Sequence, residues 1–433
     1  MVLTFIETGA YAEKQYSNLL KTNEEKLAAV VDAVADVVIN ERGKKLYIRT
    51  FAYSKEEYAN TVGCINHIKN DKVILMMKET PHDFFLTHPN DPFIGKINKP
   101  TIVEFDTGNE YNGQGVIANT WPEYVTKRWT DFIKRPNVIG YVARTDRYGT
   151  TKLVGSANEI LLYALKRSTE NPDRIYDEYI STRYGKKALE PVKNAFKKAY
   201  DIVLSSMYIL GTNAAKHSSM DYDPYSSSYD RHVSGRWLEP PVVFVEHGIN
   251  KEFHYWKDII NHIAPARFKT KDSRLGLEAR YVIEQNWVTP VELMDSLYLS
   301  YIITEKRYGV SLANEALADI ERAKDLLTPS DYDDLYRLFK RTALTAQLYE
   351  AVSTAYFGFR IYAKGKSYRY ENLEEQIRSA LNRIDLVTDE MKGMQGEYPL
   401  GQWDWLKDAE TALSYKNKIL TGWKEYNNVK FTQ

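Results

Sequence analysis

The sequence predicts an α/β protein: a partial (β/α)8 barrel of the TIM type, followed by an all-α C-terminal domain. Over residues 1–155, short apolar runs alternate with segments whose apolar residues recur at helical spacing. This alternation is typical of parallel strands joined by crossover helices. The apolar runs are continuous, as in strands that are buried on both faces. From about residue 156 onward the helical spacing continues alone, so we expect a second, α-helical domain over residues 156–433.

Five strands are expected in the barrel domain. In chain order they are Val2–Ile6, Leu46–Tyr53, Val73–Met77, Ile102–Phe105 and Val138–Ala143. The helices expected between them are Asn23–Val38, which Asn23 is suited to cap, Lys55–Asn66 and Pro122–Ile133. A closed barrel needs eight strands, so an open doubly wound sheet is the alternative. A partial barrel is favoured because polar and charged residues gather after the strands, where barrel enzymes keep their chemistry.

Seven helices are expected in the second domain, separated by helix-ending signals such as Asn171-Pro172 and Tyr184-Gly185. They are Glu159–Ser168, Arg174–Tyr184, Ala188–Leu210, Leu277–Arg307, Leu312–Leu327, Asp331–Phe359 and Glu371–Met391. Two long loops, over 216–242 and 393–405, interrupt this pattern. Loops of this length in a compact domain usually have a function or are mobile.

Composition excludes several classes of function. The 58 basic and 58 acidic residues cancel, so neither a nucleic acid nor a membrane surface is an expected partner. The single cysteine, Cys64, permits no disulfide within the chain and no thiolate metal cluster. The eight histidines lack a metal-binding spacing, and no glycine-rich phosphate loop is present, so no metal and no cofactor are expected. Two compartments are compatible with the sequence: the cytoplasm, or the periplasm or exterior if a signal peptide lies upstream of Met1.

Carboxylates follow three of the expected strands. Glu7 ends the first, Asp83 follows Val73–Met77, and Glu110 follows Ile102–Phe105. Carboxylates at the ends of neighbouring strands are what an acid/base hydrolase requires. The alternatives are a helix cap or turn former for Asp83 and a solvated strand end for Glu7.

Two cations lie on the expected strands. Arg49 interrupts an apolar run, where a guanidinium suits bidentate capture of a carboxylate. Its alternative is a structural ion pair with Glu104 or Asp106. Lys78 ends the third strand, where a buried charge needs a partner. Aromatic residues are abundant, with 33 tyrosines, but helix packing is the favoured explanation for any single tyrosine.

The segment from Lys72 to Gly115 resembles part of the α-glucuronidases of glycoside hydrolase family 67. The matching residues of its two elements are Lys78, Pro81, Asp83 and Phe84, then Glu104, Phe105, Glu110, Tyr111, Gly113 and Gln114. Upstream, Glu7-Thr8-Gly9 is similar to the element that carries the general acid of the family. The resemblance is strong over 72–175 and looser beyond. The chain departs from the family at 85–89, which read Phe-Leu-Thr-His-Pro, and lacks an expected lysine near Leu3.

The resemblance implies inverting hydrolysis of a glucuronic acid linkage on xylan-derived oligosaccharides. Glu7 would be the general acid, and Asp83 and Glu110 would activate the attacking water. Arg49 and Lys78 would bind the substrate carboxylate. The aromatic candidates for stacking on the sugars are Tyr111, Trp121 and Trp237. The resemblance also implies that the first barrel strands of the family precede this segment.

The alternative is a degenerate or truncated carbohydrate-binding protein without turnover. A third hypothesis is an α/β hydrolase of another family that shares only the general geometry. The expected partner is an oligosaccharide bearing a uronic acid, and the helical domain is a candidate homodimer interface that would also close over the barrel mouth.

Overall fold

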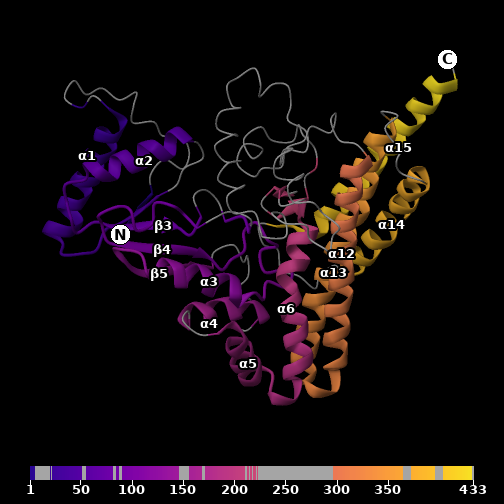
Figure 1. Cartoon of the computed structure of the whole chain (residues 1–433), viewed down its shortest axis with the longest axis horizontal. Helices are drawn as coiled ribbons and strands as arrows, with labels where there is room; N and C mark the ends of the chain where they lie inside the picture. The colour runs from indigo at the N-terminus through magenta and orange to yellow at the C-terminus, as the bar shows by residue number, and fades with distance from the viewer. Residues whose placement is uncertain are drawn as a thin grey trace.

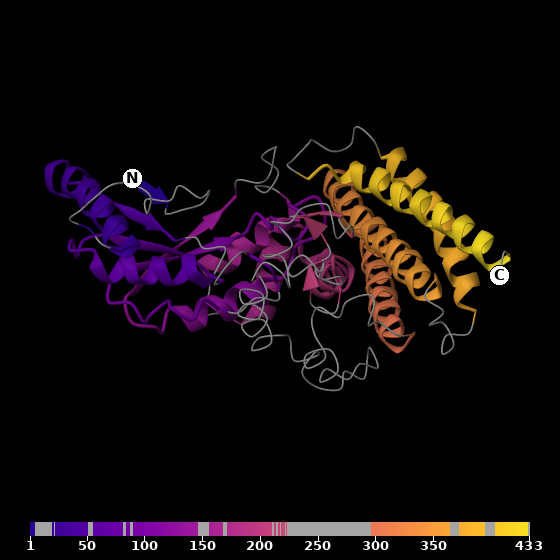
Figure 2. The same ribbon diagram turned by 90° about the horizontal axis from the view of Figure 1, so that it is seen from above.

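The computed structural model has a strand-containing part at one end and the long helices α12 to α15 at the other, with the two termini far apart (Figure 2). The structure describes residues 1–4, 20, 22–50, 55–80, 84–86, 90–145, 156–167, 171–209, 212–213, 215–216, 218–220, 222, 296–363, 372–394 and 403–431.

Five parallel strands form one sheet. They are β1 (Val2–Thr4), β2 (Tyr47–Arg49), β3 (Ile74–Lys78), β4 (Thr101–Asp106) and β5 (Val138–Arg144). Each strand pairs with the next one along the chain. A doubly wound sheet reverses its strand order at a switch point, whereas a (β/α)8 barrel adds its strands in sequence. The first part of the chain is therefore a partial TIM-type barrel, as predicted.

Three helices connect the strands: α1 (Asn23–Ala35), α2 (Lys55–His67) and α3 (Pro122–Phe132). A π-helical segment, η2 (Asp36–Glu41), extends α1. Thr22, rather than the predicted Asn23, caps α1. The Thr22 hydroxyl accepts a hydrogen bond from the Glu25 N–H, and the Glu25 carboxylate accepts one from the Thr22 N–H, each at 3.2 Å. This reciprocal pair satisfies two of the donors that a helix start leaves open.

The two faces of the sheet differ in character. Leu75, Val103 and Phe105 are buried, and the Phe105 ring packs edge-on against Trp129 and Phe132 of α3. This face is therefore covered by helices and is the outer face of the partial barrel. Successive side chains of a strand point to opposite faces, so the residues between these apolar positions point to the inner face.

The second part of the chain is mainly helical. Within the described residues its helices are η3 (Ala157–Glu159), α4 (Ile160–Lys166), α5 (Pro172–Arg183), η4 (Lys186–Ala188), α6 (Leu189–Ser206), α12 (Ser296–Arg322), η5 (Lys324–Leu326), α13 (Pro329–Ala363), α14 (Leu373–Gly393) and α15 (Trp405–Phe431). Helix α12 packs between α6 and α13, and α14 and α15 pack on the far side of α13 (Figure 1). The two-residue strands after α6 are β6 (Tyr208–Ile209), β7 (Thr212–Asn213), β8 (Ala215–Lys216) and β9 (Ser219–Met220). They form two short hairpins, β6–β7 and β8–β9.

The structure corrects three predictions in this region. The predicted break between helices at residues 308–311 is wrong, because α12 runs without interruption through Gly309. A Cβ added to Gly309 would lie 3.0 Å from Ser205 Cβ, so a glycine at this position allows α12 to approach α6 closely. The helix predicted to reach Leu210 ends at Ser206 and is followed by β6. The sequence interpretation also did not include α15.

Candidate functional site

The predicted site residues divide into two sets. Three lie outside the described part of the chain: Glu7, Asp83 and Trp237. Five are described: Arg49, Lys78, Glu110, Tyr111 and Trp121.

Charged side chains occupy the inner face of the sheet. In the strand register, Lys78 of β3 pairs with Glu104 of β4, and Asp106 of β4 pairs with Arg144 of β5. Paired residues on neighbouring strands, and residues two apart on one strand, point to the same face. The same register places Arg49, the last residue of β2, on this face. Charges from four neighbouring strands therefore meet at the carboxyl end of the sheet, where barrel enzymes place their chemistry.

Three of these side chains, Arg49, Glu104 and Arg144, form a continuous row of ion pairs with Glu110 of the loop after β4. Arg49 donates to both oxygens of Glu104, with Nε 2.7 Å from Oε2 and Nη2 3.0 Å from Oε1. Arg144 lies between two carboxylates, with Nε 3.5 Å from Glu104 Oε1 and Nη1 3.1 Å from Glu110 Oε2. The structural ion pair that was the alternative for Arg49 is thus present. Bidentate contact with a carboxylate fixes the orientation of the guanidinium.

Two cations lie over one aromatic ring. The Nζ of Lys78 is 4.7 Å from the ring centroid of Phe84, and the guanidinium carbon of Arg144 is 5.1 Å from the same centroid. The negative face of an aromatic ring attracts cations at such distances. Lys78 is only 3% exposed. Since Phe84 directly follows Asp83 in the chain, positive charge gathers beside the loop that carries one of the predicted base residues.

Two further buried carboxyls lie beside this row. Burial raises the pKa of Glu79 to about 7, although the nearby Arg128 guanidinium opposes the rise. Burial likewise raises the pKa of Asp106 to about 7, against the attraction of Arg144 and with a smaller contribution from the neighbouring Glu110 charge. The two residues are linked, because the Asp106 N–H donates to Glu79 Oε1 at 3.4 Å. Strongly shifted carboxyl pKa values are concentrated at functional sites, although structural networks produce them too.

A small cavity lies between these two carboxyls. Glu79 Oε2 and Asp106 Oδ1 are buried and accept no hydrogen bond, although Arg128 Nε lies 3.5 Å from the former. Both residues line a small cavity, in which the centre of a water molecule can occupy about 10 Å³. Its lining includes the side chains of Asn109 and Asn112. A cavity of this volume has room for about one water molecule.

The loop after β4 places Glu110 at the end of this row. The Glu110 N–H donates to Asp106 Oδ2 at 2.7 Å. Gly113 and Gln114 have positive φ values of 100° and 46°. A Cβ added to Gly113 would lie 2.3 Å from Ile117 Cγ1, so only glycine fits there. The loop after β4 is therefore tight.

Residues from the helical part of the chain hold this loop. Ser218 Oγ accepts a hydrogen bond from the Gly113 N–H at 2.9 Å and donates to the Glu110 carbonyl at 2.8 Å. The Trp403 N–H donates to Gln114 Oε1 at 2.8 Å. The Gln114 amide oxygen thus binds the backbone of a segment that is distant in sequence.

Two of the aromatic candidates are buried. Tyr111 is 6% exposed, and its ring packs at 4.3 Å between centroids against Phe85. Trp121 is 1% exposed and lies edge-on to Tyr200. A ring stacks on a sugar through an exposed face, so both rings act in packing here. This is the explanation that the sequence favoured for a single aromatic residue.

The sequence interpretation did not identify Glu79 or Arg144 as site residues. It named Asp106 only as a possible ion-pair partner of Arg49, not as a carboxyl with a shifted pKa. Arg144 directly follows the expected strand Val138–Ala143, as Lys78 follows Val73–Met77, so the same signal was present for both. Glu79 directly follows the predicted Lys78. The burial that shifts the pKa values of Glu79 and Asp106 depends on distant segments, and no local pattern indicates it.

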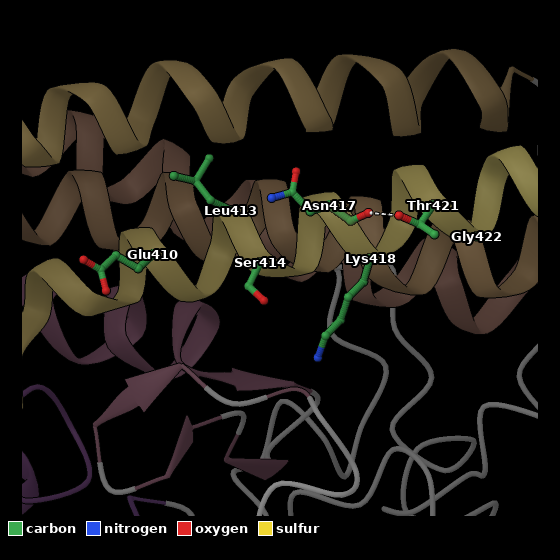
Figure 3. A pocket seen from close by; sticks show the side chains of 7 residues that line it. All are labelled: Glu410, Leu413, Ser414, Asn417, Lys418, Thr421 and Gly422. Atoms are coloured by element: carbon green, nitrogen blue, oxygen red, sulfur yellow. Dashed lines mark hydrogen bonds between the residues drawn. The ribbon is translucent and has the colours of Figure 1, made fainter.

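A second hollow lies on the surface of α15. It is an open groove of about 660 Å³ lined by Glu410, Leu413, Ser414, Asn417, Lys418, Thr421 and Gly422. In Figure 3 these side chains project from one helix, and the Thr421 hydroxyl donates to the Asn417 carbonyl. The groove has a single carboxylate, so it offers no acid/base pair.

The described residues contain neither a grouping of metal ligands nor a membrane-spanning helix. Among them, no three His, Cys, Asp or Glu side chains are grouped as metal ligands. None of the helices in the described ranges is long and apolar enough to cross a membrane.

Two solved structures similar to this chain are glycoside hydrolases. One is a family GH115 4-O-methyl-α-glucuronidase with specificity for decorated arabinogalactans, which is 11% identical, with a TM-score of 0.45. The other is a family GH138 enzyme targeting pectin rhamnogalacturonan II, also 11% identical, with a TM-score of 0.47. Each match covers 94% of this chain but only 43% and 52%, respectively, of the other chain. The chain thus spans about half the length of these structures.

No protein-family model matches the sequence, and no curated protein matches it. The resemblance to glycoside hydrolase family 67 therefore stays a prediction.

Proposed function

We propose that this chain carries the site of an inverting glycoside hydrolase that cleaves a uronic acid linkage, with glucuronic acid on xylan-derived oligosaccharides as the substrate. Glu7 is the general acid in this proposal, and Asp83 and Glu110 activate and position the attacking water. Lys78 and Arg49 bind the uronic acid carboxylate, and Trp237 stacks on a sugar ring.

The observation that carries the proposal is the row of charges on the inner face of the sheet. A neutral sugar needs no cation, whereas a uronic acid brings a carboxylate that must be neutralised on burial. Arg144 pairs with Glu110, which is itself only 3% exposed, and Lys78 and Arg49 add positive charge on neighbouring strands. Such a site suits a substrate whose charge lies close to the bond that is cleaved.

The proposed chemistry divides the work between two sides of the sugar ring. Glu7 protonates the leaving glycosidic oxygen, while Asp83 or Glu110 removes a proton from water on the opposite face. Inversion requires a separation of roughly 6.5–9.5 Å between the acid and base carboxyls, so that the water fits between base and ring. The Arg144 guanidinium keeps Glu110 in one orientation, as a base that must aim at a single water requires.

A second candidate function is sugar binding without turnover. It is favoured by the described sheet, which has five strands where a closed barrel has eight. Such a protein would bind a uronic acid oligosaccharide through Lys78 and Arg49 and release no product.

Product analysis separates the two functions. The wild-type chain is incubated with aldouronic oligosaccharides and with plain xylo-oligosaccharides, and the anomeric form of the released sugar is followed by NMR. We expect glucuronic acid from the first substrate only, and loss of at least about a hundredfold in kcat for Glu110→Gln, Asp83→Asn and Glu7→Gln. Glu410→Gln, at an exposed position on α15, is the control.

Wild-type turnover in all three amide variants would refute the acid/base assignment. Calorimetric binding of the aldouronic oligosaccharide with no released product would favour the binding protein instead.

A further inference from the structure

One buried hydroxyl joins the two loops that carry the proposed base residues. Tyr208, the first residue of β6, is fully buried. Its hydroxyl accepts a hydrogen bond from the Leu86 N–H at 3.0 Å and donates to Asn112 Oδ1 at 2.7 Å. Leu86 is in the loop after β3, three residues beyond Asp83, and Asn112 is in the loop after β4, two residues beyond Glu110.

A second contact also joins the two loops. Asn112 Nδ2 donates a hydrogen bond to the Phe84 carbonyl at 3.5 Å. Asn112 thus contacts the loop after β3 both directly and through the Tyr208 hydroxyl. Together these contacts close a small ring of hydrogen bonds between the two loops. A closed, buried network of this kind holds its members in one arrangement.

The position of Tyr208 is itself fixed by a buried cation. Lys306 of α12 donates to the backbone carbonyl of Tyr208 and, at 2.7 Å, to that of Ser205 at the end of α6. The Lys306 side chain is inaccessible to solvent and forms an ion pair with Glu305 at 3.1 Å. Two helices of the helical part of the chain therefore determine where the Tyr208 hydroxyl lies.

We propose that Tyr208 is a positioning residue, which holds the loop after β3 and the loop after β4 at the separation that the reaction requires. This inference rests on the proposed function, because it concerns the two loops that carry Asp83 and Glu110. A base and its water must be aligned to within a fraction of an ångström, so a small relaxation of one loop against the other lowers the rate. Tyr208 contacts neither substrate nor reacting atoms in this scheme.

The test compares Tyr208→Phe with Tyr176→Phe in the full chain. Tyr176 of α5 is equally buried, and its hydroxyl donates to the Thr120 carbonyl at 2.9 Å and to Glu123 Oε2 at 2.8 Å. Each variant removes one buried hydroxyl with two partners, so we expect similar losses in melting temperature. Asn112→Ala removes the link from the other side and is the second variant.

Two readouts separate positioning from stability alone. Amide hydrogen exchange, followed by mass spectrometry, should become faster at residues 84–86 and 109–115 in Tyr208→Phe and Asn112→Ala but not in Tyr176→Phe. With aldouronic oligosaccharide, kcat should fall about tenfold to a hundredfold in the first two variants, while KM changes by less than about threefold. In Tyr176→Phe, kcat should match that of the wild type.

The inference is overturned by unchanged exchange at both loops in Tyr208→Phe, or by faster exchange with an unaltered kcat. An inactive wild-type chain would instead refute the proposed function. In that case the exchange measurement would still show whether Tyr208 holds the two loops together.

Discussion

Buried charges, rather than aromatic rings, distinguish the inner face of the sheet. Glu104 is 1% exposed and is held by two arginines, so the cost of burying it is offset by strong, oriented hydrogen bonds. Asp106 has less support, because one of its oxygens accepts no hydrogen bond. Burial raises the pKa of Asp106 to about 7, although the neighbouring Arg144 guanidinium opposes the rise.

The shifted pKa of Asp106 makes stability depend on pH. Between the ordinary pKa of an aspartate, about 4, and about 7, the folded state holds a proton that the unfolded state has released. The stabilisation that Asp106 contributes to the folded state is therefore fully present below about pH 4. It decreases as the pH rises to about 7 and does not change further above that. Asp106→Asn keeps an oxygen for the Glu110 N–H but cannot ionise. We expect its free energy of unfolding to fall less steeply over this range, by up to about 1.4 kcal/mol per pH unit.

Urea unfolding at half-unit steps from pH 4 to pH 8 measures this slope, with Glu410→Gln as the control. Glu79 and Asp408, whose pKa values burial raises to about 7 and about 8, keep their own contributions in both variants. An unchanged slope in Asp106→Asn would contradict the assignment.

Individual site residues were predictable where the strand pattern itself was informative. Arg49 and Lys78 were identified because a charge inside an apolar run is conspicuous. Arg144 directly follows the expected strand Val138–Ala143, as Lys78 follows Val73–Met77, but it was missed. The role of Tyr208 was not predictable, since its two partners are 122 and 96 residues away.

Most elements could be predicted from periodicity because each buries one side against a neighbour. The strand β4, predicted as Ile102–Phe105, extends by one residue at each end, and α3 ends one residue before the predicted Ile133. The prediction failed where tertiary packing overrides a local signal. Gly309 resembles a helix end in sequence, but it lies inside α12 at a close approach to α6.

A similar close approach gives a prediction for α13. A Cβ added to Gly358 would lie 2.9 Å from Cγ1 of Ile377 on α14, and Ile377 is fully buried. Alanine gains about 1 kcal/mol over glycine within a helix, but overpacking a core costs roughly 1–3 kcal/mol. We expect Gly358→Ala to lose about 1 kcal/mol of unfolding free energy in urea titration. Gly393→Ala on α14 is the control, because nothing lies within 4 Å of its added Cβ. A stabilised Gly358→Ala protein would show that α14 moves aside freely.

Across the whole molecule, the barrel part and the helical part share buried hydrogen bonds. Arg341 Nε of α13 donates to the Val116 carbonyl at 2.7 Å, and the Ala118 N–H donates to Thr342 Oγ1 at 2.9 Å. The proposed division at residue 155 separates two patterns of secondary structure, but buried contacts cross it. A homodimer through the helical part stays a proposal, which analytical ultracentrifugation would test.

These shared contacts predict cooperative unfolding. Since the loop after β4 is buried against α13, neither part can unfold without exposing polar groups of the other. Differential scanning calorimetry should give a single heat-capacity peak, with equal calorimetric and van't Hoff enthalpies. Two resolved peaks, with the circular dichroism signal lost in two separate thermal steps, would show that the two parts unfold independently.

The hydrogen bond between Gln114 and Trp403 spans 289 residues of chain. Contacts at such separation demand a large loss of chain entropy and form late in folding. Strands and helices would therefore appear in a refolding chain well before the turn that presents Glu110 acquires its final shape. Recovery of the proposed activity would trail the return of secondary structure, and its rate would report the docking of Trp403.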